Sequence, residues 1–226
     1  LTPFADSLLP GTLEGYSLPE GDSSERNRSD LRRASKLLNE AGWSIQDGVL
    51  RNAEGTPLEL EVLIRQGDDE MLTVTGIYTS ALERLGIKLE ISTVDNAQFV
   101  ERETEYDFDL TRYRRDLSLS PGNEQRYYWG RDGITDPGSR NLMGMDSPAA
   151  EAMIDTMLTA ENRQDFTHAV RALDRVLTAG RYVIPFWKFD MGRIAHKKEM
   201  RYPDRLPVYG DFATDFMPHV WWYQAD

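Results

Sequence analysis

The chain has 226 residues, enough to bury a core as one domain or as one domain with an appendage. Its 38 acidic and 26 basic residues give a net charge of −12, which disfavours nucleic acid or an anionic membrane as a partner. Cysteine is absent, which excludes disulfides, cysteine–zinc sites and thiol nucleophiles, and no apolar run approaches the roughly 20 residues of a membrane-inserted helix.

The first elements are predicted to be a loop and a helix. Residues 1–28 contain three prolines and several small polar residues, so we expect them to be mostly loop. Ser29 is a good N-cap, and apolar residues then recur every three or four positions as far as Ala41. This spacing predicts a helix that ends at Gly42, after which Trp43 is expected to pack into the core.

A strand, a helix and a second strand are predicted next. Residues 46–55 have the composition of a short hairpin or turn. Apolar and charged residues alternate over 58–64 and again over 87–91. Between them a helix is predicted to start at 67–70, with an apolar stripe from Met71 to Leu85 and its end at Gly86. This order predicts a right-handed βαβ unit with parallel strands.

The remaining regular elements follow from capping residues and periodicity. Five are predicted: a short helix capped by Asp95 to about Thr104, a short strand marked by Phe108 and Leu110, a helix from the Ser147-Pro148 cap to about Ala160, a helix capped by Asn162 and closed by Gly180, and a strand over 182–189.

Residues 118–144 have the composition of a long irregular segment. Within 27 residues there are five glycines, two prolines, three arginines and three consecutive aromatic residues. A structureless loop of this length is uncommon in a compact domain and is usually functional or disordered. Disordered segments are poor in aromatic residues, so the composition favours a structured binding loop.

The chain resembles a known family in this segment and around it. The sequences SLSPGNEQRYYWG and DPGSRNLMG are similar to the C-terminal part of extracellular solute-binding proteins of family 5, the periplasmic oligopeptide, dipeptide and nickel binding components of ABC importers. The similarity is greatest to the branch that carries oligopeptides and microcin C. Three flanking motifs support it in the expected order: ASKLLNEAGW at 34–43, ALERLGIKLEI at 81–91 and RALDRVLTAGRYVIPFW at 171–187.

The resemblance implies an α/β fold, the C-terminal lobe of a type II periplasmic binding protein with a mixed sheet flanked by helices. It implies that residues 1–28 form the interlobe connection, 29–180 the ligand-binding lobe, and 181–226 a crossover strand and a tail that belongs to the N-terminal lobe. That lobe is expected to be missing, because Leu1 follows no signal peptide and opens mid-chain sequence. The expected role is capture of a peptide or peptide-like solute in the periplasm and its delivery to an ABC permease.

No enzyme motif, cofactor site or metal site is predicted. The three histidines are far apart, and His168 is expected at the surface. The acids of 68–70 could suggest a cation site, but acids that open a helix already stabilise its dipole. Asp107 and Asp109 share one strand face, which leaves a hydrolase conceivable, although nothing else supports it.

One candidate site residue, Asp116, comes from the resemblance. In the peptide-binding relatives, an Asp shortly after an aromatic residue pairs with the α-amino group of the ligand, and Tyr113 followed by Asp116 matches that spacing. The relatives usually have Trp in place of Tyr, and in the most similar branch the Asp is often missing. The alternative is that Asp116 pairs with Arg114 or Arg115 at the surface.

The other candidates lie in the 118–144 segment. Arginine suits a ligand carboxylate or phosphate, aromatic rings suit a pocket wall, and amides suit a ligand main chain. For the aromatic residues, a hydrophobic anchor of the loop is an equally good interpretation. The candidates are Arg126 and Arg140 for the anion, Tyr127, Tyr128 and Trp129 for the wall, and Asn123 and Asn141 for the main chain.

The C-terminal tail suggests an alternative function. Residues 199–226 are rich in proline and aromatic residues, and residues 181–205 contain seven bases and three acids. An exposed apolar end is an aggregation hazard or an interface. The tail is therefore predicted either to need a partner absent from this chain or to fold back locally, and a sensor or protein-interaction module remains the alternative to solute transport.

Overall fold

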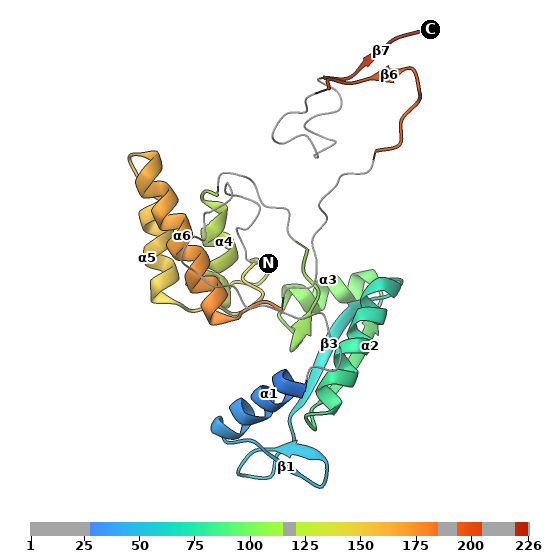
Figure 1. Ribbon diagram of the computed structural model, residues 1–226, viewed down its shortest axis with the longest axis vertical. Helices are drawn as coiled ribbons and strands as arrows, with labels where there is room; N and C mark the ends of the chain where they lie inside the picture. The colour runs from blue at the N-terminus through green and yellow to red at the C-terminus, as the bar shows by residue number, and fades with distance from the viewer. Residues whose placement is uncertain (1–27, 115–120, 185–193, 205–219, 226) are drawn as a thin grey trace. The chain divides into compact units, whose positions relative to one another are not determined.

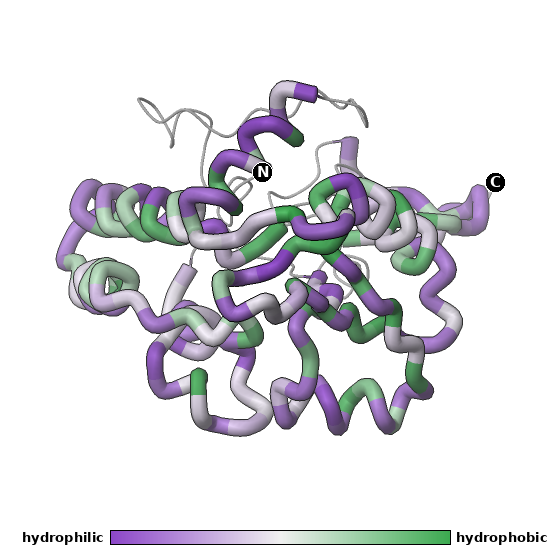
Figure 2. Tube along the Cα trace, turned by 90° about the horizontal axis from the view of Figure 1, so that it is seen from below, coloured by the Kyte–Doolittle hydropathy of each residue, from purple (hydrophilic) through white to green (hydrophobic). Residues whose placement is uncertain are grey.

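The computed structural model describes residues 28–114, 121–184, 194–204 and 220–225 (Figure 1). The chain divides into two units between Val183 and Ile184. Hydrophobic and hydrophilic positions alternate along the helices in Figure 2, as expected where one face of each helix is buried.

The first described element is the predicted helix, but it already includes Arg28 and Ser29, so Ser29 is not its N-cap. α1 (Arg28–Glu40) is followed by Gly42, whose φ of 90° lies in the left-handed region that favours glycine at the end of a helix. None of the residues of α1 is fully buried, but Leu38 packs against the core of the following sheet. Trp43 packs against the same core, which confirms its expected place.

A hairpin follows, which begins two residues before the hairpin or turn region predicted at 46–55 and overlaps it. β1 (Ser44–Gln46) and β2 (Val49–Arg51) pair antiparallel. The two residues between them, Asp47 and Gly48, have φ values of 50° and 81°. Positive φ at both central residues is the requirement of a tight type I′ turn, and Asp-Gly is a preferred pair for it.

The predicted βαβ unit is confirmed. β3 (Glu59–Arg65) and β4 (Lys88–Val94) pair in parallel along their whole length, with α2 (Asp69–Glu83) as the connection. β5 (Leu110–Thr111) pairs in parallel with the other edge of β3, so the strand order is β4-β3-β5. The sheet was expected to be mixed; its three described strands are all parallel.

Helices cover both faces of this sheet. α2 packs on the face that carries Val62 and Ile64, where the first hydrophobic core lies. α3 (Asn96–Thr104) lies on the opposite face, where Arg102 of α3 donates hydrogen bonds to Glu61 of β3 and to a serine of β4. This two-sided cover is typical of parallel sheets.

A second hydrophobic core is helical. α5 (Pro148–Leu158) packs along α6 (Arg163–Gly180), and both contribute to a buried cluster that includes Trp129. The predicted caps are confirmed, because Ser147 and Asn162 accept hydrogen bonds from the first turns of these helices.

Two expectations need correction near the end of α6. The helix extends through Gly180 and ends on Arg181, which adopts the left-handed conformation with φ of 53° in place of the glycine. The strand predicted over 182–189 does not include residues 182–184, and the rest of that range lies outside the described residues.

The 118–144 segment is more regular than predicted. It contains α4 (Glu124–Trp129) and the 3₁₀ helix η1 (Arg131–Ile134). The three consecutive aromatic residues therefore lie on a helix, where neighbours in sequence point in different directions.

The second unit contains a short antiparallel ribbon. β6 (Met200–Arg201) pairs with β7 (Trp222–Tyr223), and the rings of His196, Tyr202 and Trp221 pack beside it. The tail thus pairs locally within this unit, while its assignment to an N-terminal lobe stays a prediction. Among the described residues, no helix is both long enough and apolar enough to span a membrane.

Candidate functional site

The carboxyl ends of the parallel strands mark the first candidate region. Because β3, β4 and β5 run in the same direction, their carboxyl ends lie at one edge of the sheet, the usual place for ligands in α/β folds. Arg112, directly after β5, forms an ion pair of 2.5 Å with Asp68, the N-cap of α2. Tyr113 follows and is 40% exposed.

Four of the predicted site residues come together at this point. The guanidinium carbon of Arg140 lies 5.7 Å from the ring centre of Tyr127 and 5.8 Å from that of Tyr128. Nη1 of Arg140 donates a hydrogen bond of 3.2 Å to the hydroxyl of Tyr128. Tyr113 lies close enough to act electrostatically on Arg140. We call Tyr113, Tyr127, Tyr128 and Arg140 the tyrosine–arginine cluster.

The tyrosines favour the charged form of Arg140. The hydrogen bond with Tyr128 is the main cause that raises the pKa of Arg140, and charge interactions with Tyr128, Tyr113 and Tyr127 add to it, while partial burial opposes them. Tyr127 is 48% exposed, so the cluster is open to a ligand. Aromatic surface beside a guanidinium can bind a planar anion attached to an apolar or flat group.

Trp129 and Asn141 have a different environment. Trp129 is 2% exposed in the helical core, and its indole nitrogen donates a hydrogen bond of 3.0 Å to Gln125. Asn141 is 1% exposed and makes three side-chain hydrogen bonds of 2.9 Å, to the carbonyls of Gly130 and Met145 and from the amide of Met145. Of the two interpretations of Trp129, the geometry favours the loop anchor, and the amide of Asn141 is occupied by the loop itself.

The remaining predicted residues do not join the cluster through any described contact. Arg126 forms an ion pair with Asp155 of α5, so its charge is already compensated. Asn123 occupies the N-cap position of α4 without a capping bond from its side chain. Asp116 lies outside the described residues, and its role stays a prediction.

One residue that the sequence interpretation missed positions the segment. Tyr106 follows α3 with a φ of 57°, and its hydroxyl lies 2.6 Å from Oγ of Ser139, 2.9 Å from the carbonyl of Gly133 and 3.0 Å from that of Asp136. The amide of Gly138 donates to the carbonyl of Thr104 nearby. A lone tyrosine after a helix has no sequence signal that would predict these long-range bonds.

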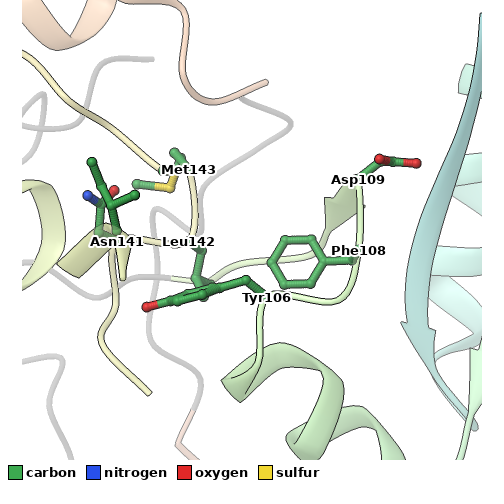
Figure 3. A pocket seen from close by; sticks show the side chains of 8 residues that line it. Tyr106, Phe108, Asp109, Asn141, Leu142 and Met143 are labelled. Atoms are coloured by element: carbon green, nitrogen blue, oxygen red, sulfur yellow. The ribbon is translucent and has the colours of Figure 1, made fainter. Parts of the chain in front are cut away.

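Tyr106 also lines a shallow cavity of about 330 Å³ between the approach to β5 and the loop at 141–144. Figure 3 shows Tyr106 and Phe108 on one side and Leu142 and Met143 on the other. Asp109 points away toward β3, where its carboxylate accepts a hydrogen bond of 2.7 Å from the amide of Glu61. Both polar and apolar atoms line this cavity, and Asn141 is the single predicted site residue on its wall.

The acidic residues considered as a cation site or as hydrolase carboxylates have structural partners. Asp68 caps α2, as expected for acids that open a helix. Asp107 pairs with Arg102, and Asp109 accepts a backbone hydrogen bond, so the two carboxylates are engaged separately. His168 is exposed, and within the described ranges no three His, Asp or Glu residues gather as metal ligands would.

Known proteins resemble the chain in sequence and in fold. The probable peptide-binding protein YejA of Agrobacterium fabrum is 37% identical over 209 residues, which cover 92% of this chain and 33% of the relative. The peptidoglycan-binding protein YepA of the same organism is 33% identical over 215 residues, 95% of this chain and 33% of the relative. The chain thus spans about a third of the length of these relatives.

The fold is that of a part of one lobe of a type II periplasmic binding protein. The oligopeptide-binding protein AppA from Bacillus subtilis, in complex with a nonapeptide, superposes with a TM-score of 0.61 and 19% identity, over 67% of this chain and 30% of that one. A model of the bacterial extracellular solute-binding proteins, family 5 middle region, matches residues 3–136. The chain therefore belongs to the bacterial extracellular solute-binding proteins of family 5.

Proposed function

We propose that this chain forms part of the solute-binding component of an ABC importer, and that it supplies one wall of a site for a peptide or peptide-like solute. The peptide-binding relative and the nonapeptide complex of a protein with the same fold support this role. The observation that carries the proposal is the exposed tyrosine–arginine cluster at the carboxyl edge of the sheet.

The physical argument is one of contact area and charge. Tyrosine rings provide a large contact surface at a low cost in side-chain entropy, and a guanidinium provides several fixed donors. A solute held between two lobes makes contacts with both, and those contacts favour the closed state. A chain that supplies one lobe makes only some of them, so we expect it to bind its solute weakly by itself. Delivery to a permease from the periplasm is part of the same proposal.

The first test uses the full-length natural protein, purified without refolding and examined by native mass spectrometry for a bound ligand. A ladder of short-peptide masses would support the proposal. A single non-peptide mass would retain solute capture but replace the ligand class. Absence of any small ligand, together with a stably bound protein, would contradict the proposal.

The second test uses substitution of the cluster. Tyr113→Ala combined with Tyr127→Ala is expected to weaken binding of the co-purified ligand by about tenfold or more, since two exposed aromatic surfaces are removed. The control is His168→Ala, at an exposed position on α6. Equal affinities of the two variants in calorimetry would argue against the cluster as the solute site.

A second function, protein docking through the tail, rests on one observation. Trp222 and Tyr223 of the short ribbon are 48% and 67% exposed. Replacing both with serine is expected to abolish capture of a protein partner while leaving small-ligand binding unchanged. Loss of small-ligand binding instead would place the tail within the solute-binding protein's own structure.

A further inference from the structure

We infer that Arg140 binds an anionic group of the solute, so that the ligand is a peptide or peptide-like acid that presents a carboxylate to the tyrosine–arginine cluster. The inference rests on the proposed function and adds the chemical group by which the solute is recognised. It follows from a comparison of Arg140 with four arginines of the same unit that have carboxylate partners.

The comparison concerns charge compensation. Four arginines of the unit are paired with carboxylates, so their charges are already balanced. These pairs are Arg102 with Glu61 and Asp107, Arg112 with Asp68, Arg126 with Asp155, and Arg131 with Asp146. Because a neighbouring carboxylate already balances the charge of a paired arginine, a ligand anion is attracted to it less strongly.

Arg140 has neutral partners instead. Its contacts among the described residues are with Tyr127 and Tyr128, and Tyr113 is near enough for a charge interaction. None of these partners is a carboxylate. The positive charge of Arg140 therefore stays uncompensated by any described carboxylate, on a face that is exposed.

The contacts of Arg140 also orient its guanidinium in a way that suits a planar anion. One N–H of Nη1 bonds to the Tyr128 hydroxyl, and two rings lie about equally far from the guanidinium carbon, at 5.7 and 5.8 Å. These contacts restrict the side chain while they use one of its five N–H donors. A restricted guanidinium loses less entropy on binding, and its fork matches the two oxygens of a carboxylate.

Hydrogen bonds connect the tyrosine–arginine cluster to the end of α3. The hydroxyl of Tyr127 donates a hydrogen bond of 3.0 Å to the carbonyl of Gly138, and the amide of Gly138 donates one of 3.1 Å to Thr104 at the end of α3. Arg140 follows Gly138 by two residues. The position of its backbone is therefore tied to the βαβ part of the unit.

The test compares peptides that differ only in the anion. Alanine peptides of two to five residues would be titrated calorimetrically into the full-length natural protein, as free acids and as C-terminal amides. A third set, amides that end in glutamate, places the carboxylate on a side chain. We expect carboxylate-bearing peptides of one of these sets to bind about tenfold more tightly than the neutral alanine amides.

Two substitutions locate the anion site. Arg140→Gln is expected to reduce the preference for the acid to less than about threefold, and Arg140→Lys to leave an intermediate preference, because lysine retains the charge but not the fork. The control is Arg131→Gln in the same segment, whose charge is paired with Asp146, and it should retain the full preference.

The outcomes separate this inference from the proposed function. Equal affinity for acids and amides in the unmodified protein, or an acid preference that survives Arg140→Gln, would overturn the inference and leave peptide capture intact. Tight binding of inorganic phosphate, lost in Arg140→Gln, with no preference among the peptides, would replace the carboxylate with a phosphate. Failure of every peptide to bind would contradict the proposed function and the inference together.

Discussion

The 118–144 segment has one buried face and one exposed face. Gln125, Trp129 and Asn141 are buried and bonded to the segment or its neighbours, whereas Tyr127 and Arg140 are exposed and contact each other. The two groups alternate in sequence, and Arg140 and Asn141 are adjacent. The composition of the segment predicted a binding role, but it does not distinguish residues that anchor the segment from exposed residues that can contact a ligand.

The helix of α4 produces much of this separation. Residues four apart lie on the same side of a helix, which places Gln125 and Trp129 together on the core side. Tyr127 falls between them in sequence and so points elsewhere. If this comparison is right, substitutions on the buried face should change stability first, and those on the exposed face should change binding first.

The largest expected effect on stability comes from Trp129→Ala. The change removes a 2% exposed ring from the helical core, at a cost of about 3–5 kcal/mol in the free energy of unfolding. Urea denaturation followed by circular dichroism measures it. A loss of ligand affinity without a shift of the unfolding midpoint would instead identify Trp129 as a ligand contact.

Asn141→Ala and Arg140→Gln are expected to differ strongly in their effect on stability, although the two residues are adjacent. It leaves the amide and the carbonyl of Met145, together with the carbonyl of Gly130, without their buried partner, and should cost about 2–3 kcal/mol. Arg140→Gln should change stability by no more than about 0.5 kcal/mol, since the side chain is exposed. Equal destabilisation by the two variants in thermal unfolding would contradict the division of the segment into a buried face and an exposed face.

Tyr106→Phe tests how the segment is attached to the βαβ part. The change removes the hydroxyl that contacts Ser139 and two carbonyls, and should cost about 1–2 kcal/mol. Phenylalanine keeps the ring, so the core is little changed. We expect faster amide exchange at Gly138 and Ser139, with Tyr202→Phe, at an exposed position, as the control. Unchanged exchange there would show that other contacts hold the segment.

The smallest effect concerns pH and α3. Burial raises the pKa of Glu103, and the nearby Arg65 partly opposes the shift. The folded state thus binds this proton more tightly than the unfolded state, so its contribution to stability is present at low pH and is lost as pH rises through the raised pKa. Glu103→Gln should therefore stabilise by up to about 0.5 kcal/mol at pH 7 relative to its effect at pH 4, a small gain because the side chain is only half-buried and water screens its charge. The test is to measure the melting temperatures of the unmodified protein and of Glu103→Gln at pH 4 and pH 7. A larger stabilisation by the substitution at pH 4 than at pH 7 would contradict the raised pKa of Glu103.

The regular elements were largely predictable from local patterns. The caps at Asp95, Ser147 and Asn162 and the parallel βαβ unit were predicted from residue type and spacing and are confirmed. These features depend on neighbours within one helix turn or on alternation along one strand, which a single sequence displays directly.

The candidate site was predictable only as a region. The aromatic residues and arginines of 118–144 indicated a binding segment, but α4 is six residues long and too short for a periodic pattern to reveal. The pairing of Arg126 with Asp155, 29 residues away in sequence, and the bonds of Tyr106 across the chain had no local signal.

By itself, the amino-acid sequence determined α1, the βαβ unit, α3, α5 and α6 in their order, the family resemblance and the segment rich in candidate binding residues. Only the tertiary structure decided which of those residues are anchors and which are exposed. The physical reason is that burial and charge compensation depend on partners brought together by folding. Asn141 is occupied because it bonds to Met145 and Gly130, and among the described residues the neighbours of Arg140 are tyrosines and not carboxylates.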